Sequence, residues 1–280
     1  MLTAAAFRRL QRYALYAGVL LVCALVLFPV YWMLVTSIRP TRFSINYPPA
    51  LWPEEFRWTA YLELFRTIPV ATWLRNTFSV SLGTTIVCLT LSIIGGYALS
   101  RFRWRGRGLF GFALLSTQML PEALLVIPIF IIFRQIGLID TLTGLVVADA
   151  AFVVPVGVWI LKGFFDTIPQ EVCEAALVDG CTPLGVLWRI ILPLSLPALV
   201  AVSVVAFFEG WNEYLFASTF ITSSELRVAS IGLASFIGEL ATPVELVLAC
   251  ATVFTIAPVV FYIAMQRHIV SGLTGGAVKG

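Results

Sequence analysis

The sequence predicts an all-α integral membrane protein with six membrane-spanning helices and a polar helix–turn–helix between the fourth and the fifth. Of the 280 residues, 60% are apolar and only 12% are charged, whereas a soluble domain carries about twice that charged share. The apolar residues come in blocks of about 20, the length that a helix needs to cross a bilayer. Residues 166–193 interrupt this pattern with charged and small residues.

The six apolar stretches are expected to form one transmembrane domain over residues 1–280. Glu122 and Asp149 are single acids in the third and fourth stretches, whereas the first, second and sixth carry no charge. Prolines inside most spans predict bent helices around a cavity, because the freed carbonyls must find partners there. Gly95 and Gly96 predict a close helix–helix approach in the second span. The spans are residues 13–37, 76–100, 109–133, 142–161, 194–220 and 246–266.

The basic residues predict that both termini are cytosolic, because cytoplasmic segments carry an excess of Lys and Arg. With that orientation, eleven of the eighteen basic residues lie inside, and residues 101–107 hold four of them directly beside a span. The eleven are Arg8, Arg9, Arg12, Arg101, Arg103, Arg105, Arg107, Lys162, Arg189, Arg267 and Lys279. The net charge of +3 then reflects topology and gives no case for nucleic-acid binding.

The longest loop outside the membrane, residues 38–75, contains an amphipathic segment. Its apolar residues recur at helical spacing, which predicts a helix that lies in the membrane interface, packs on the span ends or contacts an external partner. They are Trp58, Tyr61, Leu62, Phe65 and Ile68.

Several classes of site have no motif in this chain. The five cysteines show no pairing pattern, and two of them, Cys173 and Cys181, are expected in the cytosol, where disulfides are rare. The sequence contains no CxxC, no HExxH and no GxxxxGK[ST], so neither a metal site nor a nucleotide-binding loop is predicted. The first apolar run is too long for a signal-peptide core, and no cleavable signal peptide is expected.

The polar stretch 166–193 has the local signals of two helices. Asp166 or Thr167 can cap the first helix, and Pro169 suits its first turn. Gly180 suits the left-handed position that ends a helix, and Thr182-Pro183 starts a second helix. Ala175 and Ala176 would allow close approach by a partner surface, to which Glu174 offers a charge.

This stretch resembles the EAA loop of the permease subunits of ATP-binding-cassette importers. The matching residues are Glu174, Ala175, Ala176, Gly180, Ile190, Leu192 and Pro193, and the pair Asp179-Gly180 is also common in that family. The resemblance implies a coupling helix that sits in a cleft of an ATPase subunit, with Glu174 paired to a basic group there.

The last residues, 267–280, are similar to the tail of the second permease subunit of maltose-type carbohydrate importers. In that subunit the tail reaches between the two ATPase subunits, and Gly272, Gly275, Gly276 and Lys279 would lie at this interface in extended backbone; a disordered end is the alternative. The resemblance implies a prokaryotic cytoplasmic-membrane complex with a second permease, two ATPases that hold ATP and Mg²⁺, and an extracytoplasmic sugar-binding protein. This chain itself would bind no cofactor and catalyse no reaction. Its spans would contact membrane lipid.

Polar groups inside the spans are the candidate substrate path, because a carboxylate at mid-bilayer costs roughly 2.5–3.5 kcal/mol and is expected to face the interior. Gln118 and Glu122 are four residues apart in the third span, and Glu209 and Glu213 share a face in the fifth. Trp211 and Asn212 could add an aromatic plane and an amide for a sugar. Alternatively, these groups hold the bundle or the partner subunit together.

Three other functions stay open from the sequence. A permease for another polar solute, such as glycerol phosphate, would be expected to carry an inward Arg or Lys, and no span has one in its middle. A stand-alone secondary transporter would show repeat symmetry between its halves. A polytopic membrane enzyme would need clustered Asp or His, and the chain has a single His.

Overall fold

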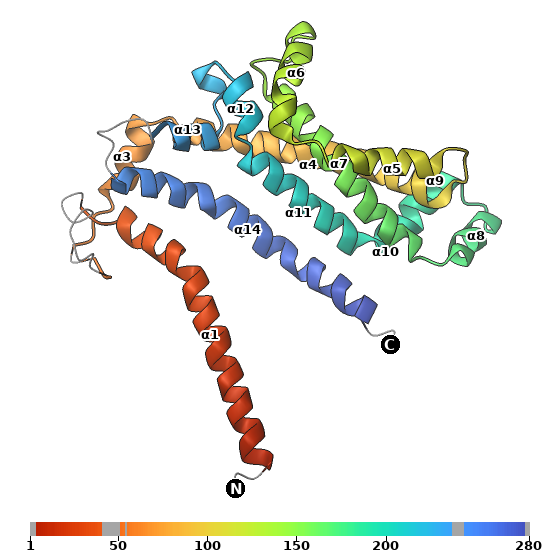
Figure 1. The fold of residues 1–280 in the computed structure, drawn as a ribbon, viewed down its shortest axis with the longest axis horizontal. Helices are drawn as coiled ribbons and strands as arrows, with labels where there is room; N and C mark the ends of the chain where they lie inside the picture. Colours follow the sequence, from red (N-terminus) through yellow and green to blue (C-terminus); the bar gives the residue numbers. More distant parts are fainter. Residues whose placement is uncertain (1–3, 41–50, 54, 237–243, 278–280) are drawn as a thin grey trace. The chain divides into compact units, whose positions relative to one another are not determined.

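The computed structural model describes residues 4–40, 51–53, 55–236 and 244–277, and every regular element among them is helical (Figure 1). The chain forms two compact parts, residues 1–69 with 235–255, and residues 70–234 with 256–280. The long helices are α1 (Ala4–Ser37), α4 (Val70–Arg101), α7 (Leu142–Asp166), α11 (Leu196–Asn212) and α14 (Val244–Ala277). The shorter ones are α3 (Thr59–Thr67), α5 (Arg107–Thr117), α6 (Glu122–Gln135), α8 (Gln170–Val178), α9 (Pro183–Val186), η1 (Leu187–Ile191), α10 (Leu192–Leu194), α12 (Leu215–Phe220), η2 (Ser224–Leu226) and α13 (Ala229–Ser235).

The first part contains α1 and α3, which a hydrogen bond between Ser37 Oγ and Tyr61 Oη joins at 2.7 Å. The helix predicted in the long loop is confirmed as α3. Its buried residues are Ala60 and Leu64, whereas the aromatic side chains Trp58 and Phe65 are exposed. The apolar face predicted for this helix is therefore partly exposed, while Tyr61 contacts Ser37 of α1.

The second part is built on α4, α7 and α11, which pack against one another along their lengths. The close approach predicted at Gly95-Gly96 is confirmed, since a Cβ added to Gly96 would lie 3.1 Å from the backbone nitrogen of Lys162 and 3.1 Å from Leu161 Cβ. Hydroxyls on the buried face of α4 donate to the backbone one turn earlier, as Ser81 does to Thr77 O at 2.8 Å. Such bonds satisfy polar groups where water is absent.

The third predicted span is not one continuous helix. It consists of α5 and α6, which meet at a bend of 102°. Pro121 explains the break, because the residue before a proline is pushed out of the helical region and proline itself has no N–H to donate. Pro121 accordingly has ψ 125° and precedes the first residue of α6.

The fifth predicted span is also divided, into α11 and α12. Helix α11 ends at Asn212, and Glu213 with ψ 118° turns the chain before α12 begins at Leu215. The Oε1 atom of Glu213 accepts the backbone N–H groups of Phe216 at 2.6 Å and Ala217 at 3.1 Å. This carboxylate thus satisfies donors at the new helix start that have no partner inside the helix.

Five helices of the described residues are long and apolar enough to cross a membrane, and the bent pair α5–α6 makes up to six. The helices extend beyond the predicted spans at either end: α1 starts at Ala4 and α4 at Val70, before the predicted starts at 13 and 76. Helix α7 continues to Asp166 and α14 to Ala277, beyond the predicted ends at 161 and 266. Both extensions include polar residues. Hydropathy excludes such residues from a predicted membrane span, but a helix can continue through them.

A carboxylate joins the two irregular loops that follow α6 and α12. Asp140, with φ 56°, accepts the N–H groups of Thr222 and Ser223, each at 2.9 Å, and the hydroxyl of Ser223 donates to its other oxygen. The Ser223 hydroxyl and these backbone donors lower the pKa of Asp140 to about 2. Because folding lowers this pKa, the contribution is present above the unfolded value near 4 and is lost as the pH falls toward 2.

Candidate functional site

Helix α8 begins at Gln170, two or three residues later than a cap at Thr167 or Asp166 predicts. Pro169 precedes its first residue, and no side chain caps it. Neither predicted cap acts as one, because Thr167 Oγ1 donates backwards to Phe164 O at 2.7 Å and Asp166 pairs with Lys162 at 2.6 Å. Both residues belong instead to the end of α7. That is the physical reason why the cap prediction is wrong.

The end of α8 has the predicted left-handed glycine. Gly180 has φ 87°, and the two backbone bonds of a Schellman motif surround it, Cys181 N to Ala176 O at 2.9 Å and Gly180 N to Leu177 O at 3.1 Å. An added Cβ at Gly180 would meet nothing within 4 Å. Its backbone conformation, and not a lack of space, therefore requires glycine here.

The second helix of the stretch starts as predicted and then widens. Thr182 Oγ1 accepts Gly185 N–H at 3.1 Å, and Pro183 occupies the first turn of α9. The next turn, η1, is a π-helix that leads into α10 with Pro193 inside. A widened turn before Pro193 is consistent with the clash between a proline ring and the carbonyl four residues earlier.

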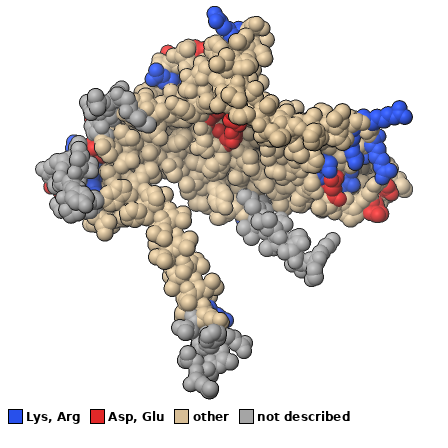
Figure 2. Space-filling view, in the orientation of Figure 1, with Lys and Arg blue, Asp and Glu red and all other residues tan. Residues whose placement is uncertain are grey.

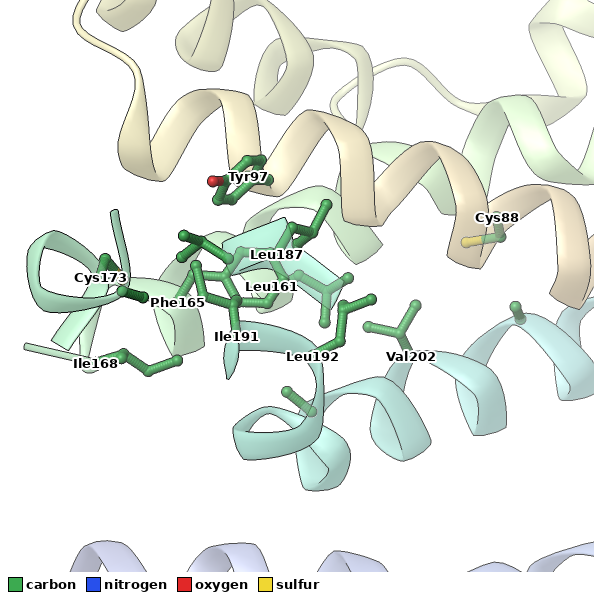
Figure 3. Packing of buried hydrophobic residues seen from close by; sticks show 14 of the residues in the cluster. Cys88, Tyr97, Leu161, Phe165, Ile168, Cys173, Leu187, Ile191, Leu192 and Val202 are labelled. Atoms are coloured by element: carbon green, nitrogen blue, oxygen red, sulfur yellow. The ribbon is translucent and has the colours of Figure 1, made fainter. Parts of the chain in front are cut away.

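The residues of the stretch 166–193 divide into an inward and an outward set. Figure 3 shows Cys173, Leu187, Ile191 and Leu192 directed into one apolar cluster with Leu161 and Phe165. Ala176 belongs to this cluster and is only 7% exposed. The prediction that Ala176 faces a partner is therefore wrong, because its methyl group fills the core between α8 and the long helices.

The outward set consists of Glu174, Ala175 and Asp179, which are exposed on α8. Glu174 accepts a hydrogen bond from Gln170 Nε2 at 2.7 Å, one turn earlier on the same helix. We call the exposed residues Glu174, Ala175 and Asp179 the α8 surface. It presents two carboxylates and one small side chain beside the apolar side chains of Leu177 and Val178, which are 45% and 88% exposed.

Three side chains of α4 tie this loop to the membrane helices. Tyr97 Oη donates to Pro183 O at 2.8 Å, and Ser100 Oγ donates to Asp166 Oδ1 at 2.6 Å. The Nη2 of Arg101 donates to Phe165 O at 2.6 Å and Ile168 O at 2.9 Å, on carbonyls at the end of α7. These bonds join α4 to the residues that flank α8 on either side, the end of α7 and the start of α9. The sequence argument missed these residues, whose only signal is their place at the end of a span.

A second feature is a polar cavity of about 280 Å³ at the junction of α6, α11 and α12. Figure 2 shows acidic side chains gathered in the middle of an otherwise uncharged area near this junction. Neither Lys nor Arg lines the cavity. Its lining brings together Glu122, Phe208, Glu209, Asn212, Glu213, Tyr214 and Leu215.

The structure brings three of the five predicted path residues into this cavity, Glu122, Asn212 and Glu213. Gln118 lies on the other side of the α5–α6 break and donates to Phe152 O at 2.9 Å, so the argument that it shares a helix face with Glu122 is wrong. Trp211 is 2% exposed and stacks on Phe207 with ring centroids 5.7 Å apart.

The aromatic groups at the cavity are instead Phe208 and Tyr214, which the sequence argument did not single out. Asp149 lies deeper and is 2% exposed; its Oδ2 accepts Thr84 Oγ1 at 3.3 Å. Asp149 also interacts with the side chain of Glu213, so it links α7 both to α4 and to the wall of the cavity.

The predicted tail differs from the structure in its backbone. Gly272, Gly275 and Gly276 lie within α14, which remains helical to Ala277, so the prediction of extended backbone at these glycines is wrong. Each glycine destabilises a helix interior by roughly 1 kcal/mol relative to alanine. A long helix can include a few such residues because adding a residue to an existing helix is easier than starting a new one. Lys279 lies outside the described residues.

A family model decides the identity of this chain: residues 88–275 match that of the binding-protein-dependent transport system inner membrane component. The chain belongs to this family. It is therefore a multi-pass membrane permease, and the matched residues include both the α8 loop and the polar cavity.

Individual relatives extend the match over the whole permease. A trehalose transport system permease of Mycobacterium tuberculosis is 36% identical over 96% of this chain and 99% of its own length. An inner membrane ABC transporter permease of Escherichia coli is 35% identical over 98% of each chain. A crystal structure of a bacterial ABC transporter for alginate import contains a chain with TM-score 0.81 at 24% identity, covering 95% of this chain and 98% of that one. That likeness concerns the fold.

Proposed function

We propose that this chain is the permease subunit through which an ATP-binding-cassette importer moves a carbohydrate across the cytoplasmic membrane. The observation that carries the proposal is the α8 surface: two exposed carboxylates and a small residue stand on a helix whose other face is locked into the membrane helices. An element of this kind transmits force, because its outer face is free for a partner and its inner face cannot slide.

The mechanism assigns the driving force to partner ATPases. Two such subunits would hold ATP and Mg²⁺, and one would bind the α8 surface with a basic group opposite Glu174. When the ATPases close, α8 would move and pull α4 and α7 through the bonds of Tyr97 and Arg101. The polar cavity at the α11–α12 junction would then open alternately to the two sides of the membrane.

The remaining partners follow from the family and the relatives. A second permease subunit would complete the path, and an extracytoplasmic binding protein would deliver the cargo. We place both termini in the cytosol, on the side of α8, because residues 101–107 concentrate four arginines beside that helix. The C-terminal residues 267–280 would reach the ATPase interface, and of these the residues up to Ala277 form the end of α14.

A neutral carbohydrate is the cargo that the cavity supports best. Carboxylates and the amide of Asn212 accept and donate hydrogen bonds to hydroxyls, and Tyr214 offers an aromatic plane. Glu122, Glu209 and Glu213 would repel a phosphate ester, and no basic residue of the lining offsets them. This arrangement speaks against glycerol phosphate, and the relative named for trehalose supports a carbohydrate cargo.

Uptake by cells tests this proposal. In a strain that lacks the gene, the wild-type chain should restore ATP-dependent uptake of labelled neutral oligosaccharides, trehalose first, and no uptake of glycerol phosphate. Glu209→Gln should lower uptake several-fold, because it changes a group on the cavity wall, whereas Glu225→Gln, an exposed residue outside the cavity, should leave it unchanged. Restored uptake of glycerol phosphate alone would contradict the proposed cargo.

A further inference from the structure

A second and larger cavity, about 620 Å³, lies between the end of α4, the linker of residues 102–106 and helix α8. Three arginines face it, Arg101, Arg103 and Arg107, and one acid, Glu174. Figure 2 shows basic side chains gathered at the end of the molecule that carries α8 and α9. The cavity is thus a positively charged recess directly behind the α8 surface.

The positive charge of this recess is only partly matched within the chain. Arg101 donates to backbone carbonyls, which carry no net charge. Asp166 beside it is already paired with Lys162. Among the described residues no ion pair involves Arg103 or Arg107. Glu174 offsets one of the three arginines, which leaves an excess of about two positive charges for a ligand.

The surroundings place this recess at the level of lipid headgroups. The membrane span α4 ends at Arg101, and on α5 the apolar side chains of Leu109 and Phe112 are 74% and 68% exposed. Phe102 and Trp104 alternate with the arginines of the linker and are 47% and 43% exposed. Exposed aromatic rings next to basic residues are typical of the membrane–water interface.

We propose that this recess binds the phosphate of an anionic phospholipid. A guanidinium binds phosphate oxygens through two parallel hydrogen bonds, and Arg103 with Arg107 can supply two such forks from one short linker. The acyl chains of the bound lipid would extend along the exposed apolar side of α5. Free inorganic phosphate could form the same hydrogen bonds, but it has no apolar part that would contact the exposed rings of Phe102 and Trp104.

Lipid binding here would link membrane composition to the motion of α8. The same recess is bounded by the linker on one side and by Gln170, Glu174 and Leu177 of α8 on the other. A bound phosphate would face Glu174 across the recess, and the repulsion between these two negative charges would make the position of α8 sensitive to the headgroup. Bilayers poor in anionic lipid would lack this interaction.

Lipid retention measured by native mass spectrometry tests the inference on the purified transporter. In nanodiscs of equal parts phosphatidylglycerol and phosphatidylcholine, we expect phosphatidylglycerol to be retained preferentially. The double variant Arg103→Gln/Arg107→Gln should lower its retention about tenfold through loss of charge-assisted bonds. The matched control Arg105→Gln/Arg134→Gln removes the same charge from residues that do not line the recess, and it should change retention less than about twofold.

Three results would overturn the inference. Equal losses in both double variants would show non-specific attraction to basic residues. Displacement of the lipid by millimolar inorganic phosphate would assign the recess to a soluble anion. Unchanged lipid retention with loss of the ATPase subunit from the Arg103→Gln/Arg107→Gln complex would assign it to the partner protein. The measurement does not involve transport, so its failure is distinct from failure of the proposed function.

Discussion

Glu174→Lys is expected to abolish coupled transport while the chain remains folded and inserted. Glu174 is exposed on α8 and accepts a hydrogen bond from Gln170 on the same helix, so the fold does not depend on its charge. At the proposed interface, the reversed charge faces a basic group of the ATPase, and a desolvated pair of this kind is worth on the order of 2–5 kcal/mol. Uptake and substrate-stimulated ATP hydrolysis in proteoliposomes measure the effect.

A matched variant separates coupling from net charge. Glu225→Lys makes the same change at an exposed position in η2, away from α8, and should leave uptake at the wild-type rate. If Glu174→Lys supports normal uptake and normal ATPase assembly, the α8 surface does not carry the coupling.

Gly96→Val is expected to destabilise the membrane bundle itself. A Cβ at this position would lie 3.1 Å from Lys162 N and 3.3 Å from Val158 O, both backbone atoms that cannot move aside as a side chain can. Overpacking of a tight contact costs about 1–3 kcal/mol, and here it would push α4 away from α7. We expect a lower melting temperature of the purified chain and reduced uptake, measured by thermal unfolding in detergent.

The control for this variant is Gly163→Val on α7. A Cβ at Gly163 would meet nothing within 4 Å, so the same substitution adds the same side chain without a collision. Its melting temperature should remain close to the wild-type value. Equal losses in both variants would mean that helix propensity, not the α4–α7 approach, sets the stability.

Local chemistry made several features predictable from the sequence. The apolar runs predicted the long helices, because a membrane span needs about 20 such residues whatever surrounds it. Gly180 and Thr182 were predictable because the left-handed turn and the helix cap depend on neighbouring residues alone. Gly96 was predictable because small side chains mark close helix contacts in membranes.

Features that depend on distant residues were not predictable. The bond from Tyr97 to Pro183 joins residues 86 apart in sequence, and only the packed structure shows it. Ala176 and Trp211 face the core because of what lies beside them in space, so a motif or a composition argument assigns them equally well to a partner or a ligand. Pro121 marked a possible break, but the angle of 102° depends on the packing of α5 and α6.

The same distinction separates the two regions of the candidate site. The end of α8 follows from its own sequence, because Gly180 makes the left-handed turn there, whereas its start and its exposed face depend on packing against α7 and the core. The polar cavity requires α6, α11 and α12 to meet, and this meeting admits Glu122 but leaves Gln118 outside. Tyr214 lines the cavity because α11 ends at Asn212 and redirects the chain.

Cysteine cross-linking between α8 and the ATPase tests the central claim most directly. In a chain whose five native cysteines are replaced by serine or alanine, Ala175→Cys should form a cross-link to an ATPase subunit with a short bifunctional reagent. Ala176→Cys, one residue away but buried against the core, should form none. If Ala176→Cys reacts, or if Ala175→Cys fails to cross-link in an assembled and active transporter, α8 does not bind the ATPase through the surface described.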